Sequence, residues 1–125
     1  MDNPQTHILI VDDSPDDRNM YAHFPSRKGC RVSKARDGKE GLEKALELQP
    51  HLIVLDLWLP IISGWEAMHR LKTDERTKHI PVLVVTGHSS VRTRECDGWM
   101  TKPCPLDQLA AEITAILEAR GEGRG

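Results

Sequence analysis

Short apolar runs alternate with longer amphipathic stretches along this chain, and this alternation limits the possible folds more than any other feature. Four such runs occupy residues 7–11, 52–55, 82–85 and 99–101. Their length is typical of buried strands, and strands separated by helical segments form a parallel sheet covered on both faces. A half-polar segment at 30–35 is predicted to add an edge strand. We therefore expect an α/β fold with a doubly wound, five-stranded parallel sheet.

The length and charge of the chain favour one domain without a nucleic-acid-binding surface. At 125 residues, the chain has the common size of a single domain. We expect one domain over 1–125, with a core over about 6–119 and a flexible tail at 120–125. The 17 basic and 19 acidic residues are mixed along the chain and give a net charge of −2. Direct binding to nucleic acid or to a membrane is therefore not expected.

Cysteine spacing and the N-terminal residues favour a cytoplasmic protein. The three cysteines, at positions 30, 96 and 104, are widely spaced, so they indicate neither a disulfide framework nor a zinc site. The first apolar run is too short for a signal peptide or a membrane span. These features fit a reducing compartment.

Helix boundaries are marked by capping residues. Three helix starts are predicted, at Ser14 with Pro15 and Asp17, at Asp37 with Glu40, and at Ser63 with Glu66. The first of these helices should cover 15–28, but Pro25 should kink or end it near Phe24. A last helix after Pro105 has apolar residues at helical spacing, at 106, 109, 110, 113, 116 and 117.

The connection before the last strand is unusually short. Only 15 residues separate Thr86 from Lys102. About four of them are needed for the strand, which leaves residues 87–97, about the minimum for a crossover between parallel strands. We therefore expect the fourth helix of the fold to be shortened or missing.

Residues able to bind a metal or a phosphoryl group follow the four apolar runs. Asp12 and Asp13 follow the first run, Asp56 the second, Thr86 the third and Lys102 the fourth. The carboxyl ends of parallel strands form one rim, where ligands of such sheets bind. These side chains are therefore predicted to meet in one site.

The chemistry of this set indicates phosphoryl transfer assisted by a metal. Each residue alone has a simpler explanation: Asp12 and Asp13 as a strand end before a helix cap, Asp56 as a strand end, Thr86 as a turn residue and Lys102 as a surface charge. Together, however, the three carboxylates repel one another unless a cation such as Mg²⁺ binds them. A hydroxyl and an ammonium beside a central carboxylate would stabilise a phosphoryl group during its transfer.

Several spaced motifs resemble those of a known family. Asp12-Asp13, Asp56 with Pro60 and Gly64 downstream, Thr86-Gly87 and Lys102-Pro103 are similar to the signature of the receiver (CheY-like) domain of two-component response regulators, and the similarity runs from about 7 to 117. The resemblance implies a flavodoxin-like sheet with the strand order 2-1-3-4-5. It also implies that Asp56 accepts a phosphoryl group from a sensor histidine kinase, a histidine phosphotransfer protein or a small donor such as acetyl phosphate.

The same resemblance implies a metal site. Asp13 and Asp56, with the backbone carbonyl of Trp58, would ligate Mg²⁺, and Asp12 would act mostly through a metal-bound water. Trp58 and His88 occupy positions that influence the access of water to the acyl phosphate in similar proteins. The bulky Trp58 is hypothesised to slow hydrolysis.

The resemblance further implies a switch. Lys102 would pair with Asp56 and then with the phosphoryl oxygens, and Thr86 would turn inward to bond one of them. Trp99 stands where an aromatic residue rotates with this threonine. The bond between Lys102 and Pro103 is similar to one that is cis in the family.

These features predict a stand-alone receiver that switches partner binding when phosphorylated. It would assist its own phosphorylation and dephosphorylation without being an enzyme that acts on other substrates. We expect a monomer or weak dimer whose downstream protein target the sequence does not identify. A degenerate receiver, acting as a phosphorylation-independent interaction module, is the main alternative.

Two other classes of protein fit less well. An aspartate-nucleophile phosphatase of the haloacid-dehalogenase type normally has a second acid two residues after the nucleophile, where this chain has Trp58. A flavin or nucleotide binder would need a phosphate-binding loop after the first strand, but residues 12–17 are mostly acidic and would repel phosphate.

Overall fold

The computed structural model, which describes residues 5–87 and 95–120, has an α/β fold built on one parallel sheet. The strand order is β2-β1-β3-β4-β5, and each neighbouring pair is parallel. This confirms the predicted flavodoxin-like architecture. The strands are β1 (His7–Val11), β2 (Arg31–Ala35), β3 (Leu52–Leu55), β4 (Val82–Thr86) and β5 (Gly98–Thr101).

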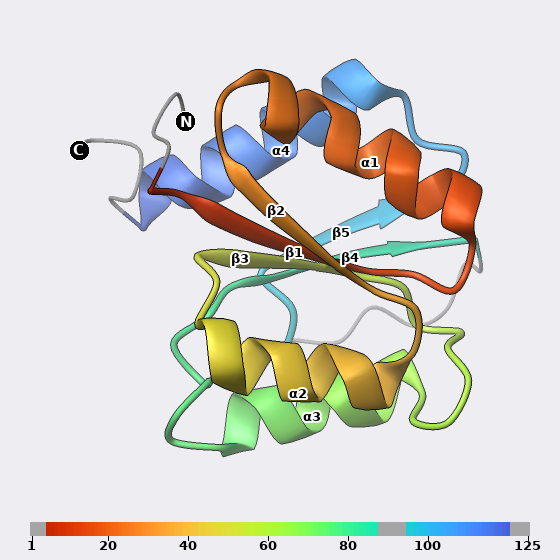
Figure 1. Cartoon of the computed structure of the whole chain (residues 1–125), viewed down its shortest axis with the longest axis vertical. Coiled ribbons are helices and arrows are strands. Elements are labelled where there is room, and N and C mark those ends of the chain that lie inside the picture. Colours follow the sequence, from red (N-terminus) through yellow and green to blue (C-terminus); the bar gives the residue numbers. More distant parts are fainter. Residues whose placement is uncertain (1–4, 88–94, 121–125) are drawn as a thin grey trace.

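Helices cover both faces of the sheet. Within the described residues they are α1 (Pro15–Arg27), α2 (Gly38–Leu48), α3 (Gly64–Thr73) and α4 (Leu106–Ala119). Figure 1 shows α1 and α4 on one face of the sheet and α2 and α3 on the other. None of these four helices is long and apolar enough to cross a membrane. The predicted shortening of a further helix before β5 concerns mainly residues 88–94, which lie outside the described residues.

Alternation along the central strands forms two cores, one on each face of the sheet. Ile8 and Ile10 of β1 pack in the same cluster as Ile113 of α4, whereas Leu9 and Val11 belong to the cluster on the α2 and α3 side. The central strands β1, β3 and β4 are buried along their whole length, because both of their faces are covered. The edge strand β2 is partly exposed, which agrees with its half-polar sequence.

The three predicted N-caps are confirmed. In each, a side-chain oxygen accepts a hydrogen bond from the backbone N–H three residues later, at distances of 2.7–3.2 Å, in the pairs Ser14 with Asp17, Asp37 with Glu40, and Ser63 with Glu66. These bonds satisfy N–H groups that have no partner within the helix itself.

Of the two predicted effects of Pro25, the end of α1 near Phe24 is wrong, because the helix continues to Arg27, and the kink stays a prediction. Pro25 lies in the last turn, where the missing N–H removes one hydrogen bond and the ring is buried. The chain then leaves the helix at Gly29, with a φ of 82°, and the Cys30 N–H donates to the Pro25 carbonyl at 3.0 Å. This glycine-dependent C-terminal motif stabilises the turn that contains the proline.

Stability should fall in mild acid because of His7. This side chain is only 5% exposed, and its Nε2 lies 2.7 Å from Ser33 Oγ. Burial, followed by the charge of Arg31 and the proximity of His51, lowers the pKa of His7 below its usual 6.5. The unfolded chain therefore binds a proton more readily than the folded one, so the free energy of unfolding decreases as the pH falls below 6.5, by at most about 1.4 kcal/mol per pH unit.

Urea unfolding at pH 7.5 and at pH 5.5 tests this expectation. Carboxylates also titrate as the pH falls, so the comparison is with His7→Gln, which removes only the imidazole. The difference in unfolding free energy between the two pH values should be smaller in His7→Gln than in the wild type. An equal difference in both proteins would contradict the assignment to His7.

Candidate functional site

The ends of four strands bring the predicted residues to one rim of the sheet. Asp12 follows β1, Asp56 follows β3, Thr86 ends β4, and Lys102 follows β5. Hydrogen bonds continue the sheet at this rim, since the Asp56 N–H donates to the Val11 carbonyl at 3.0 Å and the Lys102 N–H donates to the Thr86 carbonyl at 2.8 Å. Residues up to 90 positions apart in sequence thus become neighbours.

Three carboxylates form a cluster that fits a divalent cation. One oxygen each of Asp12, Asp13 and Asp56 lie within 4.8 Å of one another. Asp12 and Asp56 are 2% and 7% exposed, whereas Asp13 is exposed to solvent. Hard carboxylate oxygens, with one side open to water, suit Mg²⁺, which keeps several of its water ligands. The structure thus brings together the three side chains predicted as metal ligands, and the carbonyl of Trp58 stays a prediction.

The ammonium of Lys102 neutralises part of this negative charge. Its Nζ lies 3.1 Å from Asp56 Oδ2, as predicted, but also 2.8 Å from Asp12 Oδ2 and 2.7 Å from Asp17 Oδ2. Burial of Lys102 disfavours its charged form, but the hydrogen bonds to Asp12 and Asp17 outweigh this and raise the pKa of Lys102 above its usual 10.5. Lys102 therefore remains positively charged at neutral pH.

The environment of Asp12 is set by burial and by donors from α1. Burial raises the pKa of Asp12 above its usual 3.8, while the hydrogen bonds from Lys102 and from the Ser14 N–H oppose the increase. The Ser14 N–H donates to Asp12 Oδ1 at 2.9 Å, and Arg18 donates to the Asp12 carbonyl at 2.7 Å. The N-cap residue of α1 thereby orients the Asp12 carboxylate, and Arg18 of α1 holds the Asp12 backbone.

Asp56 is oriented by the loop that follows it and by the start of α3. The Trp58 N–H donates to Asp56 Oδ1 at 3.3 Å, which leaves Oδ2 facing Lys102. Gly64 begins α3 directly against this strand end, since its N–H donates to the Leu57 carbonyl at 2.8 Å. A Cβ at Gly64 would lie only 2.1 Å from the Asp56 carbonyl oxygen. This close approach explains why a glycine follows Asp56 at this distance in the sequence.

Thr86 and Trp99 lie on neighbouring strands. Thr86 is completely buried at the end of β4. Trp99 of β5 is paired with Val84 of β4. Thr86 lies two residues after Val84 on the same strand, so the side chains of Thr86 and Trp99 point to the same face of the sheet. Trp99 packs in the cluster on the α2 and α3 side, with its ring centroid 6.0 Å from that of Trp65. The coupled movement of Thr86 and Trp99 stays a prediction.

One member of the site, Asp17, was not predicted from the sequence. The helix-cap pattern assigns Asp17 only to the start of α1, although the run of acidic residues at 12–17 was a signal that a further carboxylate could lie in the site.

Of the other predicted residues, Trp58 is 56% exposed and lies two residues after Asp56. His88 lies outside the described residues. The Lys102–Pro103 bond is cis.

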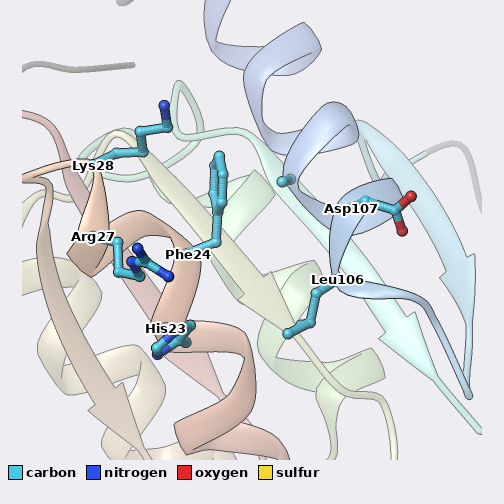
Figure 2. A pocket seen from close by; sticks show the side chains of 7 residues that line it. His23, Phe24, Arg27, Lys28, Leu106 and Asp107 are labelled. Atoms are coloured by element: carbon cyan, nitrogen blue, oxygen red, sulfur yellow. The ribbon is translucent and has the colours of Figure 1, made fainter.

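A separate groove lies between α1 and α4. It has a volume of about 460 Å³. In Figure 2, α1 and the residue after it contribute His23, Phe24, Arg27 and Lys28, and α4 contributes Leu106 and Asp107. Its lining residues include neither a carboxylate of the cluster nor Lys102, so this groove is distinct from the site at the rim of the sheet.

Comparison with known proteins identifies the family. The family model of the response regulator receiver domain matches residues 8–114. The chain is 36% identical over 116 residues to the DNA-binding dual master transcriptional regulator RpaA of Synechocystis, covering 88% of this chain but only 48% of RpaA. It is 30% identical to the polar-differentiation response regulator DivK of Brucella ovis, covering 88% of this chain and 94% of DivK. The chain thus spans about half of RpaA and nearly all of DivK.

Solved structures agree with this assignment. The chemotaxis response regulator CheY4 of Vibrio cholerae superposes with a TM-score of 0.82 at 28% identity, over 90% of this chain and 99% of CheY4. The N-terminal domain of a response regulator receiver protein from Methanoculleus marisnigri has a TM-score of 0.72 at 32% identity, over 89% of this chain and 95% of that domain. Since the family model, the relatives and the solved structures each match most of its length and agree, the chain belongs to the response regulator receiver domain family.

Proposed function

We propose that this receiver domain accepts a phosphoryl group on Asp56 in a Mg²⁺-dependent reaction and thereby switches its binding to a partner protein. The observation that carries the proposal is the position of Asp56, 3.1 Å from the ammonium of Lys102 and within a cluster of three carboxylates. A degenerate receiver is disfavoured, because the residues needed for phosphorylation all lie at the same rim of the sheet. They are the proposed acceptor Asp56, the acid pair Asp12 and Asp13, Thr86 and Lys102.

The proposed reaction transfers a phosphoryl group to the Asp56 carboxylate, either from the imidazole of a phosphorylated histidine or from the acyl oxygen of acetyl phosphate. A carboxylate oxygen of Asp56 forms a bond to phosphorus, while the bond from phosphorus to the donor nitrogen or oxygen breaks and the donor keeps the electron pair. Lys102 stabilises the negative charge on the phosphoryl oxygens. Mg²⁺ would be held directly by Asp13, Asp56 and the Trp58 carbonyl, and through a water molecule by Asp12. When bound, it would neutralise the negative charge of the carboxylate and phosphoryl oxygens.

Phosphorylation would act as a change of charge at the rim. A phosphoryl group adds about −1.5 to −2 charge and several strong acceptor oxygens. Thr86 and Lys102 would be captured by these oxygens, and Trp99 would follow Thr86 on the same face of the sheet. The loop after β5 would then change position and alter the surface offered to a partner; the loop after β4 lies mainly outside the described residues.

The proposed phosphorylation requires two kinds of partner, a donor of the phosphoryl group and a protein that recognises the phosphorylated form. A sensor histidine kinase or a histidine phosphotransfer protein would donate the phosphoryl group in the cytoplasm, and a downstream protein would recognise the phosphorylated form. RpaA is a DNA-binding transcriptional regulator by name and DivK a regulator of polar differentiation. For this chain we propose a receiver domain, monomeric or weakly dimeric, that does not itself contact nucleic acid and does not act as an enzyme on other substrates.

Incubation with acetyl phosphate tests the proposal directly. Intact-mass measurement should show one added phosphoryl group in the presence of Mg²⁺ and none in the presence of excess EDTA. If the mass stays unchanged with Mg²⁺ and every phosphodonor supplied, including a phosphorylated histidine kinase, the proposed function is wrong.

Mg²⁺ should stabilise the folded protein. Binding to the three carboxylates relieves their repulsion, so at a Mg²⁺ concentration of about ten times Kd the unfolding free energy should rise by about 1.4 kcal/mol. Urea unfolding with MgCl₂, against NaCl at equal ionic strength, measures the gain. Asp13→Asn removes an exposed ligand and should largely abolish it. The same gain in Asp13→Asn would place the metal elsewhere.

Trp58 should slow the loss of the phosphoryl group. The Trp58 backbone N–H donates to Asp56 Oδ1, and its side chain is 56% exposed, so we propose that the bulky indole shields the acyl phosphate from water. In Trp58→Ala, the phosphorylated form should decay several-fold faster, measured by intact mass after removal of the donor. Trp58→Phe, which keeps an aromatic ring, should decay at an intermediate rate. An equal or longer lifetime in Trp58→Ala would contradict the hypothesis.

A further inference from the structure

Lys102 has two carboxylate partners, Asp12 and Asp17, besides the proposed phosphoacceptor Asp56. Its ammonium donates to Asp17 at 2.7 Å, to Asp12 at 2.8 Å and to Asp56 at 3.1 Å. An ammonium carries three hydrogens, so these three carboxylates engage all of them. The longest of the three contacts is the one to the proposed phosphoacceptor, and the shortest is the one to Asp17.

Asp17 does not belong to the carboxylate cluster that is proposed to bind Mg²⁺. It lies in the first turn of α1, whereas the cluster consists of Asp12, Asp13 and Asp56. Its backbone N–H, not its side chain, makes the capping bond with Ser14. The Asp17 carboxylate is therefore directed at the lysine and can be changed without loss of the helix cap.

Asp17 can also release Lys102 at lower cost than Asp12 can. The Asp17 side chain is 29% exposed, whereas that of Asp12 is 3% exposed. Asp17 and Lys102 line an open groove of about 550 Å³ that also includes Met20 and Tyr21. A carboxylate that leaves the ammonium at this place is solvated by water in the groove, whereas a buried one would lose its partner without compensation.

We propose that Asp17 competes with Asp56 for Lys102 and thereby limits how readily the phosphorylated state forms. The inference rests on the proposed function. In the resting protein, Asp17 draws the ammonium toward α1. A phosphoryl group on Asp56 adds about −1.5 to −2 charge, which attracts Lys102 and repels the Asp17 carboxylate. Removing the charge of Asp17 should therefore favour the phosphorylated state through both effects.

Titration with beryllofluoride, a mimic of the phosphoryl group, tests the competition at saturating Mg²⁺. Asp17→Asn should bind beryllofluoride roughly fivefold more tightly than the wild type, the size expected for a partly exposed ion pair. Asp16→Asn is the matched control, because it removes one negative charge from an exposed residue of the same helical turn. Its affinity should change less than twofold, and Asp17→Glu should restore affinity toward that of the wild type.

A second measurement reports on the contact itself. The ¹⁵N resonance of the Lys102 ammonium, without beryllofluoride, should shift in Asp17→Asn and not in Asp16→Asn. Equal or weaker beryllofluoride binding in Asp17→Asn, or equal effects of both substitutions, would overturn the inference and leave the proposed function intact. A wild-type protein that takes up neither beryllofluoride nor a phosphoryl group would overturn the proposed function and this inference with it.

Discussion

The Asp56→Asn variant is expected to take up no phosphoryl group from acetyl phosphate and Mg²⁺, whereas the wild type takes up one. The reacting atom is a carboxylate oxygen, and the neutral amide of asparagine is a far weaker nucleophile. The substitution keeps the size of the side chain, and an amide oxygen can still accept the hydrogen bond from Lys102. Intact mass after incubation measures the loss, which should be complete.

A matched variant separates this loss from a general effect of charge. Asp107→Asn removes one carboxylate from the exposed start of α4, which lines the groove between α1 and α4. This variant should be phosphorylated like the wild type. Asp56→Asn should remain folded and be at least as stable as the wild type without Mg²⁺, because one member of a repelling cluster is gone. Phosphorylation of Asp56→Asn at the wild-type level would place the acceptor on another residue.

The Gly64→Ala substitution is expected to destabilise the protein by about 3 kcal/mol, the upper part of the usual range for an overpacked position. The added Cβ would lie 2.1 Å from the Asp56 carbonyl oxygen and 2.5 Å from the Leu57 Cα. Both are backbone atoms, so the start of α3 has to move away from the end of β3. Since that strand end carries the acceptor, phosphorylation by acetyl phosphate should slow as well.

Gly87→Ala is the control for this prediction. A Cβ at Gly87 meets no heavy atom of the described residues within 4 Å. Its effect on the free energy of unfolding should therefore stay within about 0.5 kcal/mol. Urea unfolding of both variants measures the two values. A similarly small loss in both would mean that α3 can shift from β3 without cost, and the role assigned to Gly64 would be wrong.

Most of the fold was predictable because local rules and burial agree along this chain. The buried runs at β1, β3 and β4 and the caps at Ser14, Asp37 and Ser63 each predicted one element, and each is present. The end of α1 was not predictable from the preference of proline alone. Pro25 is tolerated because its buried ring packs in the last turn and the Gly29 motif closes the helix after it.

The candidate site was predictable to the level of which residues meet. The order of strands in a doubly wound sheet places the residues after β1, β3, β4 and β5 on one rim, whatever their distance in sequence. Asp12, Asp13, Asp56 and Lys102 could therefore be assigned to one cluster, and they form it. The resemblance to receiver domains then added the expected role of each residue.

The sequence by itself determined the parallel sheet, its helical layers and the gathering of acids and a lysine at one edge. These follow from hydrophobic periodicity and chain connectivity, which are local properties. Only the tertiary structure decided which carboxylates accept hydrogen bonds from Lys102. The packing of α1 places Asp17 Oδ2 2.7 Å from Lys102 Nζ, although the two residues are 85 positions apart in the sequence. Such a contact depends on how a helix packs against the sheet, to within a fraction of an ångström, and no pattern along the chain encodes that distance.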